Sequence, residues 1–340
     1  MDTEVSPHGL HVSAILSVAG FSTIIHIKGP GKTPNILFDC GSIVPSTISA
    51  KHVFISHGHC DHIGATVQHA RASFSGQSNS TYYVPPQCTS LLEDAKKAFE
   101  TLDNGEISMD IQPMQPGDAV NIGSGFRVLA FPTTHRVQSQ GYFIVHSYDK
   151  LFPQYAGLDG TSLRRLRKNG IVINEKIETY ELAYTGDTTI EALLDPSMEF
   201  LFRIPILLIE MTYIDGDRSK AREWGHIHID DFIEHIELFQ NPCIIFLHLS
   251  NKYQGDARSY RPHDRILSIL RSKIPRGMHA RIGVALKSFG ATEYITPLLN
   301  RRSRNEEIEE GRPAQRQRQE DRGEGRRRRT STLCTPCNRR

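Results

Sequence analysis

The sequence predicts a mixed α/β fold, because short apolar runs of strand length stand beside segments that have helical periodicity. Strand-like runs occupy residues 11–20, 21–29 and 35–41, with glycine-containing turns between them. Residues 90–102 and 230–239 instead space their apolar side chains along one face of a helix. The chain therefore contains both sheet and amphipathic helix.

The helical segments are identified by side chains that share one face. The two faces comprise Leu91, Leu92, Ala95, Ala98, Phe99 and Leu102 in the first helix, and Phe232, Ile233, Ile236 and Phe239 in the second. Residues 71–80 are rich in serine, glycine and asparagine, and this composition predicts a loop.

Composition divides the chain into a body and a tail. At 340 residues, 38% of them hydrophobic, the chain can bury a large core, and we expect one domain over residues 1–300. Residues 301–340 hold 13 arginines and 7 acidic residues, and too few apolar residues to fold alone, which predicts a basic, disordered tail. Its run Arg326–Arg329 has three interpretations: a nuclear address, an RNA tether or a plain solvated segment.

Several protein classes are disfavoured by the composition. Six scattered cysteines do not form a disulfide framework, which favours a reducing compartment. No apolar stretch is long enough to span a bilayer, and the acidic N-terminus has no cationic signal region. We expect a cytoplasmic or nuclear protein, or one found in both places, with no membrane partner.

A dense group of metal-binding side chains follows the apolar run at residues 52–56. Within six residues the chain places His57, His59, Asp61 and His62. Because side chains alternate along an extended chain, His57 and His59 can point one way and the later pair another. Two diverging groups suit two adjacent metal ions, and imidazole with carboxylate favours zinc over calcium or magnesium.

Two metal ions need more ligands than one loop supplies, and three candidates follow other apolar runs. His135 follows residues 126–131, with Pro132 ending that strand, and His248 follows residues 243–247. Asp187 comes directly after Gly186, which permits a sharp turn. Each is the first strong metal-binding side chain after a predicted strand.

These pieces resemble the metallo-β-lactamase superfamily, whose signature is His-x-His-x-Asp-His after a strand. Within it the chain resembles short-form ribonuclease Z, the tRNA 3′-processing endonuclease. The resemblance rests on FISHGHCDHIG, FPTTHRVQSQGY, AYTGDTT, IEMTYID, GHIHIDD and FLHLSNKY, which occur in the family's order over roughly residues 10–290. It implies an αββα four-layer sandwich.

The resemblance also assigns the metal ligands. It implies that His57, His59 and His135 hold one zinc ion and that Asp61, His62 and His248 hold a second, with Asp187 bridging the two. Mn²⁺ is the alternative ion. A hydroxide between the two ions would attack the phosphodiester, because bound zinc lowers the pKa of water towards about 7.

Glu210 and His226 take roles from the same resemblance, and two aspartates take roles from their chemistry and position. Glu210 and His226 correspond to the family's Glu-His pair, in which the histidine protonates the leaving 3′-oxygen and the carboxylate orients it. Asp61 is also a candidate for accepting the proton of the attacking water. Asp39 closes an apolar run and is expected to accept a hydrogen bond from a ligand histidine.

Substrate binding is predicted from basic residues that depart from the family pattern. The insert between Tyr148 and Tyr184 lacks the family's Gly/Pro-rich arm sequence, and its cations either hold tRNA phosphates or form a solvated helical face. Lys252 stands where the family has arginine, and Ser250 beside it is a candidate phosphate contact. The cations of the insert are Arg164, Arg165, Arg167 and Lys168.

The predicted function is that of a zinc-dependent endoribonuclease that removes the 3′ trailer from precursor tRNA and leaves a 3′-hydroxyl. The resemblance also implies a homodimer, in which the arm of one subunit grips the tRNA cleaved by the other. Two alternatives stay open: another hydrolase of this fold, acting on thioesters or small phosphodiesters, and a catalytically silent RNA-binding relative.

Overall fold

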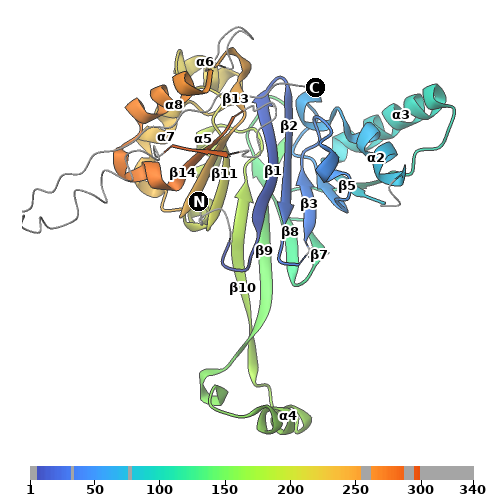
Figure 1. Cartoon of the computed structure of the whole chain (residues 1–340), viewed down its shortest axis with the longest axis vertical. Helices are drawn as coiled ribbons and strands as arrows, with labels where there is room; N and C mark the ends of the chain where they lie inside the picture. Colours follow the sequence, from blue (N-terminus) through green and yellow to red (C-terminus); the bar gives the residue numbers. More distant parts are fainter. Residues whose placement is uncertain (1–5, 32–33, 76–78, 254–261, 287–294, 299–340) are drawn as a thin grey trace, which may run out of the picture. The chain divides into compact units, whose positions relative to one another are not determined.

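Strands with continuous apolar sequence form the centre of the molecule. In the computed structural model, β11 (Ile206–Glu210) and β12 (Cys243–Leu247) are buried at every residue, as expected for strands covered on both faces. The structure describes residues 6–31, 34–75, 79–253, 262–286 and 295–298. Figure 1 shows two sheets that carry helices on their outer faces, and β11 and β12 belong to one of these sheets.

Two sheets contain the described strands. The first has the order β13-β1-β2-β3-β4-β5-β6 and comprises β1 (His11–Ala19), β2 (Ser22–Lys28), β3 (Asn35–Phe38), β4 (His52–Phe54), β5 (Thr81–Val84), β6 (Asp110–Pro113) and β13 (Leu249–Ser250). The second has the order β15-β14-β12-β11-β10-β9-β8-β7 and, with β11 and β12, comprises β7 (Ala119–Gly123), β8 (Phe126–Thr133), β9 (Ser139–Leu151), β10 (Asn174–Tyr184), β14 (Ile282–Ala285) and β15 (Ile295–Pro297).

Helices cover the outer face of each sheet. The described α-helices are α1 (Cys60–Ile63), α2 (Thr66–Ser75), α3 (Pro86–Asp103), α4 (Gly160–Lys168), α5 (Ile190–Leu193), α6 (Arg218–Glu223), α7 (Ile229–Glu234) and α8 (Pro262–Lys273). Short 3₁₀ turns are η1 (Pro45–Thr47), η2 (Pro153–Tyr155), η3 (Pro196–Arg203), η4 (Ile236–Leu238), η5 (Asn251–Tyr253) and η6 (Arg276–Arg281).

Alternating side chains build three hydrophobic layers. Phe38 packs between the sheets with Tyr142 and Leu208, whereas its neighbour Leu37 faces α2 and α3. On the second sheet, Leu207 faces α5, α7 and α8. Burying each such side chain contributes about 1.5–3 kcal/mol. The predicted α/β fold with an αββα sandwich is therefore confirmed.

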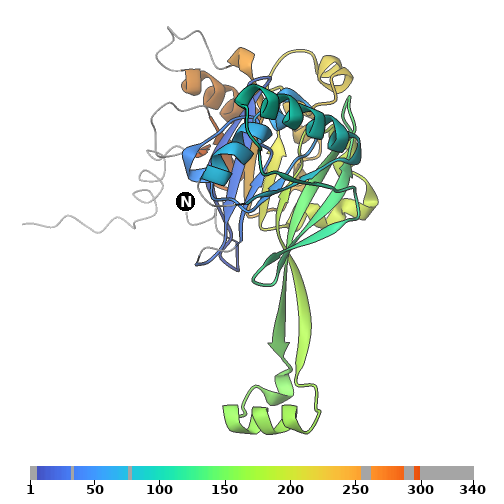
Figure 2. The same ribbon diagram turned by 90° about the vertical axis from the view of Figure 1, so that its right-hand side faces the viewer.

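A two-stranded arm extends from the second sheet. The pairing of β8 with β9 ends at Phe126 and His146, whereas β9 and β10 stay paired to Leu151 and Asn174. Residues 147–178 form this arm, and α4 lies at its far end (Figures 1 and 2). Asp159 begins α4, because its side chain accepts a hydrogen bond from the Ser162 amide.

The structure corrects the prediction that residues 71–80 form a loop, because α2 continues to Ser75. The serines that suggested a loop are compatible with a helix when the serine hydroxyl can donate a hydrogen bond to a carbonyl oxygen. Ser73 is buried and its hydroxyl donates to the Ile48 carbonyl at 2.9 Å. Residues 76–78 of the predicted loop lie outside the described residues.

The predicted helices are present with different ends and a different buried face. The first, α3, begins at Pro86, four residues earlier than expected, with proline in its first turn. Of its predicted apolar face Leu92 is buried, but Leu91, Phe99 and Leu102 are 69%, 51% and 81% exposed. The second, α7, ends at Glu234, and a 3₁₀ turn follows.

The candidate ligands converge because several strands end at one edge. β3 and β4 are parallel neighbours in the first sheet, and β10, β11 and β12 are parallel neighbours in the second. Polar residues that follow these strands therefore meet beyond their carboxyl ends.

The chain divides into two units, Met1–Leu299 and Asn300–Arg340. The second unit contains the whole of the predicted tail 301–340 and lies outside the described residues. The division into domains 1–300 and 301–340 stays a prediction.

Candidate metal centre

The loop after β4 presents two groups of side chains, as the sequence predicted. His57 and His59 precede α1, whereas Asp61 and His62 lie within it. The ring nitrogens His57 Nε2 and His59 Nδ1 are 3.1 Å apart. His62 Nε2 instead lies 3.1 Å from His248 Nε2. The bend at the start of α1 thus directs the two pairs to separate clusters.

The first cluster joins His57 and His59 to His135 and Asp187. His135 Nε2 lies 3.2 Å from His59 Nδ1, and Asp187 Oδ2 lies 3.6 Å from His57 Nε2. Two nitrogens on a tetrahedral zinc ion are about 3.3 Å apart, since each is about 2.0–2.1 Å from the metal. The spacing of these atoms therefore fits one such ion.

The second cluster contains Asp61, His62 and His248. Asp61 Oδ2 lies 3.4 Å from His248 Nε2 and 3.8 Å from His62 Nε2. Asp187 Oδ2 is 3.4 Å from His62 Nε2, so this carboxylate reaches both clusters. Asp187 is buried, and its Oδ1 atom has no hydrogen-bond partner among the described residues. A buried carboxylate oxygen that has no hydrogen-bond partner is suited to binding a metal ion.

Hydrogen bonds to the far ring nitrogens direct the lone pairs of the histidines inward. His62 Nδ1 donates to Asp39 Oδ2 at 2.7 Å, and His135 Nδ1 donates to the Gly225 carbonyl at 2.9 Å. His248 Nδ1 lies 3.0 Å from the Thr212 hydroxyl. In each ring the Nε2 atom is left to bind a metal. Asp39 thus contacts a candidate ligand histidine, and its supporting role stays a prediction.

Electrostatics favours neutral imidazoles in the first cluster. Burial lowers the pKa of His57 well below its ordinary value, and burial also lowers the pKa of His59 and His135. Burial raises the pKa of Asp187, but the imidazoles of His248 and His62 outweigh it and hold this pKa well below its ordinary value. Neutral histidines beside an ionised carboxylate are the forms that bind metal.

Backbone conformations at the site are constrained. Asp39 and His248 have φ values of 57°, and Gly186 has a φ of 59°. The glycine before Asp187 supplies the predicted sharp turn. A Cβ atom at Gly41 would lie 1.9 Å from the Asp61 carbonyl oxygen, so the loop passes too close for any side chain there. Non-glycine residues with positive φ carry strain that the surrounding structure must offset.

Glu210 and His226 form a hydrogen-bonded pair beside both clusters. His226 Nδ1 lies 2.9 Å from Glu210 Oε1, and Glu210 is buried. The Thr188 amide donates to Oε1 of Glu210, and the Thr212 hydroxyl donates to Oε2 at 2.7 Å. Burial lowers the pKa of His226, but the Glu210 carboxylate outweighs it and raises this pKa. The pair can therefore hold a proton near the metal ligands.

The predicted substrate contacts lie in two separate places. Ser250 ends β13, and the Lys252 ammonium lies 3.2 Å from Asp215 Oδ1 and 5.1 Å from the Tyr213 ring. Figure 1 shows α4 at the far end of the arm, so the structure does not bring its cations together with the clusters. All four are exposed: Arg164, Arg165, Arg167 and Lys168.

Two features of the site could not be anticipated from the motifs. Thr212 contacts Glu210, His226 and His248, although it lies within a quoted motif with no role assigned. Beside it, a cavity of about 560 Å³ is lined by Tyr213, Trp224 and Lys252, among other residues. The sequence feature that could have indicated this cavity is the single tryptophan of the chain, Trp224, which directly precedes Gly225.

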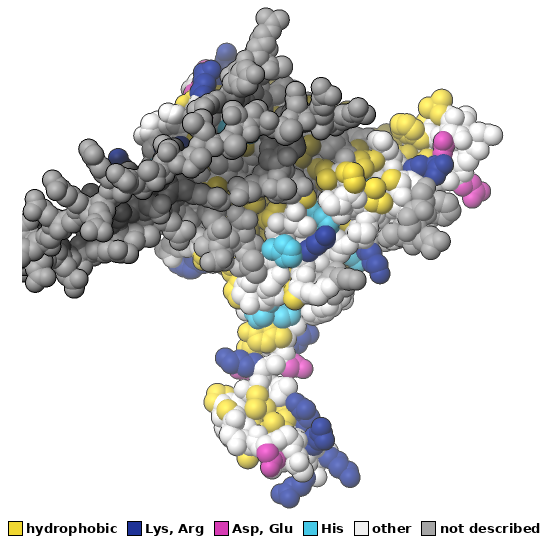
Figure 3. Space-filling model, viewed as in Figure 1, with side chains coloured by type: hydrophobic (Ala, Val, Ile, Leu, Met, Phe, Trp, Pro, Cys, Tyr) yellow, Lys and Arg dark blue, Asp and Glu magenta, His cyan; other side chains and the backbone are white. Residues whose placement is uncertain are grey.

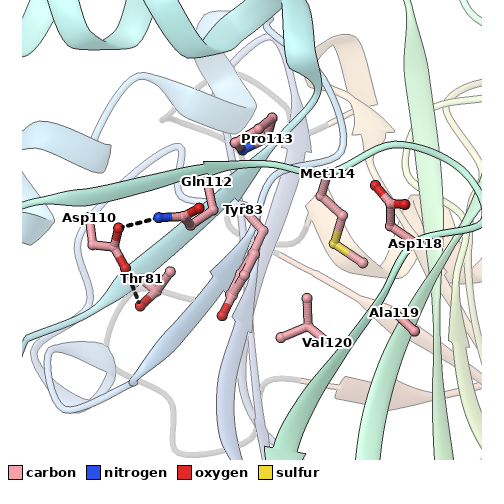
Figure 4. Close-up of a pocket in the computed structure, with 9 residues that line it drawn as sticks. All are labelled: Thr81, Tyr83, Asp110, Gln112, Pro113, Met114, Asp118, Ala119 and Val120. Carbon is pink, nitrogen blue, oxygen red and sulfur yellow. Dashed lines mark hydrogen bonds between the residues drawn. The ribbon is translucent and has the colours of Figure 1, made fainter.

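A further cavity lies away from these clusters. It has a volume of about 560 Å³ and opens between β5, β6 and β7, as Figure 4 shows. Asp110 accepts hydrogen bonds there from Thr81 and Gln112. It contains no predicted site residue.

A two-sheet sandwich with histidine and aspartate clusters at the strand ends defines the class of metal-dependent hydrolases that share the β-lactamase fold. The family model of the β-lactamase superfamily domain matches residues 35–249. The chain is 33% identical over 241 residues to tRNase Z TRZ1 of Arabidopsis thaliana, covering 70% of this chain and 85% of that protein. It is 32% identical over 244 residues to chloroplastic tRNase Z TRZ2 of the same plant, covering 70% and 67%.

A solved structure shows the same fold. Human tRNase Z, short form, superposes with a TM-score of 0.50 at 16% identity, covering 72% of this chain and 94% of that chain. The chain belongs to the β-lactamase superfamily and, within it, to the tRNase Z family.

Proposed function

We propose that this chain is an endoribonuclease that removes the 3′ trailer from precursor tRNA and leaves a 3′-hydroxyl. Family membership supports the substrate, and the Glu210–His226 pair beside two metal-binding clusters supports the chemistry. The pair is the single observation on which the proposal depends most, because a hydrolysis that expels a nucleoside 3′-oxygen needs a proton donor.

The metal ligands are proposed residue by residue. His57, His59 and His135 would hold one ion, and Asp187 would contribute to both sites. Zinc is the proposed ion and Mn²⁺ the alternative, since imidazole with carboxylate suits both. When bound, two such ions supply Lewis acidity and lower the pKa of water enough for attack near neutral pH. The ligands of the second ion would be Asp61, His62 and His248.

The chain's own residues handle the leaving group. Glu210 holds His226 through Nδ1, which leaves Nε2 as the atom that gives a proton to the departing 3′-oxygen. Thr212 keeps Glu210 in place by donating to its other oxygen. Because the carboxylate raises the pKa of His226, the imidazole keeps its proton closer to neutral pH.

The arm supplies the proposed grip on tRNA. Its four exposed cations lie on one short helix, where they can contact phosphates without reading sequence. Lys252 and Ser250 would contact phosphates nearer the cleavage position. Since α4 is remote from the clusters of its own chain, we propose a homodimer in which the arm of one subunit holds the tRNA cut by the other.

The exposed apolar face of α3 supports a second copy as partner. Leu91, Phe99 and Leu102 are widely exposed along one side of this helix. Burying them against another subunit would recover apolar surface that the described residues of one chain do not cover.

A cytoplasmic or nuclear location is also proposed. Among the described residues, no helix combines the length and apolarity needed to cross a bilayer. The run Arg326–Arg329 in the tail, outside the described residues, is the candidate nuclear address. Imaging of the full chain and of a chain ending at residue 300 tests this role directly.

The test of function is cleavage of a precursor tRNA that carries a labelled 3′ trailer. The full chain with Zn²⁺ is expected to release the trailer and leave a 3′-hydroxyl, and removal of residues 301–340 shows whether the tail contributes. A thioester substrate is assayed in parallel. Thioester turnover without trailer cleavage would overturn the proposal. The proposal would also be overturned if the chain bound no metal and cleaved no RNA.

A further inference from the structure

A third cluster of metal-binding side chains lies where the arm leaves the second sheet. It consists of His8, from the turn before β1, with His146 of β9 and Glu181 of β10. One ligand atom from each residue lies within 4.8 Å of the others. Histidine side chains are visible at this base of the arm in Figure 3. None of the three belongs to the centre described above.

Two buried atoms of this cluster have no partner among the described residues. Glu181 is 1% exposed, and its Oε2 atom accepts no hydrogen bond. His146 Nδ1 is likewise buried and without a partner. Leaving such buried polar atoms unsatisfied is costly, so two of them in one cluster indicate a ligand that satisfies both.

The surroundings put both groups in the form that a metal requires. The Ser124 main chain hydrogen-bonds to His146, and Nε2 is the nitrogen available to it, which leaves a lone pair on Nδ1. Burial lowers the pKa of His146, which favours the neutral ring. Burial raises the pKa of Glu181, but hydrogen bonds from Thr179, Ser6 and His8 outweigh it and lower this pKa.

Packing holds the two histidine rings in place. The His146 ring stacks on Phe126 with centroids 4.2 Å apart, and it lies 4.4 Å from the His8 ring. His8 Nδ1 is 2.7 Å from Glu181 Oε1, and its side chain is 28% exposed. Two ligand atoms on a tetrahedral zinc ion are about 3.3 Å apart, so the widest spacing in this cluster closes by up to about 1.5 Å when an ion binds.

We propose that His8, His146 and Glu181 bind one divalent ion of the zinc class, separate from the catalytic pair. Two imidazoles and a carboxylate are a ligand set that zinc accepts, with water in the fourth position. Binding replaces the proton shared by His8 and Glu181 and satisfies both unpartnered atoms. The ion joins the N-terminal turn to both strands of the arm at its base, and so stiffens the arm.

Zinc counting in matched variants tests this site without any activity assay. The full chain, stripped with chelator, is loaded with excess Zn²⁺, desalted and analysed for metal. Wild type is expected to hold one more zinc ion per chain than His146→Ala or His8→Ala. His11→Ala is the matched control, because His11 lies three residues from His8 and outside the cluster, and it should hold as much zinc as wild type.

A second readout measures the mechanical consequence. Added Zn²⁺ should slow hydrogen exchange in residues 147–151 and 174–178 of wild type. The slowing should be smaller in His8→Ala. Since His8 is partly exposed, this variant keeps the test valid if His146→Ala fails to fold. Equal zinc content in wild type and His8→Ala would overturn the proposal and leave the cluster as a hydrogen-bonded anchor for the N-terminal turn.

Discussion

At the scale of single residues, one buried carboxylate organises much of the metal centre. Asp39 accepts hydrogen bonds from His62 Nδ1, from the Ser56 amide and hydroxyl, and from the Tyr184 hydroxyl. Ser56 in turn contacts His57 Nδ1 at 3.0 Å. Both clusters therefore depend on a single acidic side chain, which occupies a strained left-handed conformation.

Thr212 links the proposed proton donor to the second cluster, and its hydroxyl can be removed with little change of shape. Thr212→Val should lower cleavage or zinc affinity by about 10–100-fold, because His248 and Glu210 both lose an orienting hydrogen bond. Thr212→Ser keeps the hydroxyl and should behave as wild type. Kinetics on trailer-bearing tRNA together with zinc content checks this, and unchanged behaviour of the valine variant would contradict it.

The candidate ligands could be predicted from sequence because each follows an apolar run. Asp187 and His248 are the first metal-binding side chains after their strands, and the structure brings them together as expected. Thr212 could not be predicted, since a threonine hydroxyl has no distinguishing pattern. His8, His146 and Glu181 could not either, because none of them lies in one of the quoted motifs.

At the scale of elements, the arm helix separates binding from chemistry. Changing Arg164 and Arg167 together to alanine should raise KM several-fold with little change in kcat, because contacts far from the reacting phosphate act on ground and transition states alike. The salt dependence of KM should also weaken. The matched lysine pair keeps both charges and should retain most of the affinity. A fall in kcat alone would contradict this role.

The exposed apolar face of α3 predicts that two copies of the chain form a dimer through this helix. Wild type should sediment as a dimer, at about twice the 38.3 kDa of one chain. Phe99→Glu should shift it towards monomer, because burying a charge in an apolar interface is costly. Lys97→Glu introduces the same charge at a neighbouring exposed position and should leave the dimer intact. A monomeric wild type, or a dimeric Phe99→Glu, would contradict the proposed interface.

Element type was more predictable than element environment. The apolar spacing in α3 correctly predicted a helix, but periodicity cannot say which neighbour covers the stripe. Leu92 packs on the first sheet, whereas Leu102, on the predicted face, is 81% exposed. Residues 71–75 were wrongly predicted as loop because composition alone does not reveal that Ser73 finds a carbonyl partner inside the fold.

At the scale of the whole molecule, the layers are built from strands whose apolar side chains alternate between an inner and an outer core. This arrangement places every site loop on a rigid support. The sequence predicted α/β alternation, and the order of strands within each sheet could come only from the resemblance or the structure, since pairing between distant strands has no local signature.

Acid sensitivity of the fold follows from buried neutral histidines. His69 is fully buried, accepts from the Tyr82 hydroxyl and contacts the Thr47 carbonyl, and burial lowers its pKa. Below pH 6.5 the unfolded chain takes up a proton that the folded chain does not. The free energy of unfolding should therefore fall as pH drops from 6.5, by up to about 1.4 kcal/mol per pH unit for this histidine.

His69→Gln isolates that contribution. The variant should be less stable than wild type at pH 7.5, but the difference between the two should shrink as pH falls below 6.5. Urea unfolding of both proteins at identical zinc concentrations measures it, so that metal loss affects both equally. A difference that is constant with pH would contradict the assignment.

The central claim is that His226 donates the proton to the leaving 3′-oxygen and is not itself a ligand of the neighbouring metal centre. The most direct measurement is zinc content and trailer cleavage on the same preparation of His226→Ala. The variant should hold as much zinc as wild type and cleave at least about 100-fold more slowly, the loss expected for a missing proton donor. Loss of zinc, or cleavage at the wild-type rate, would contradict the account.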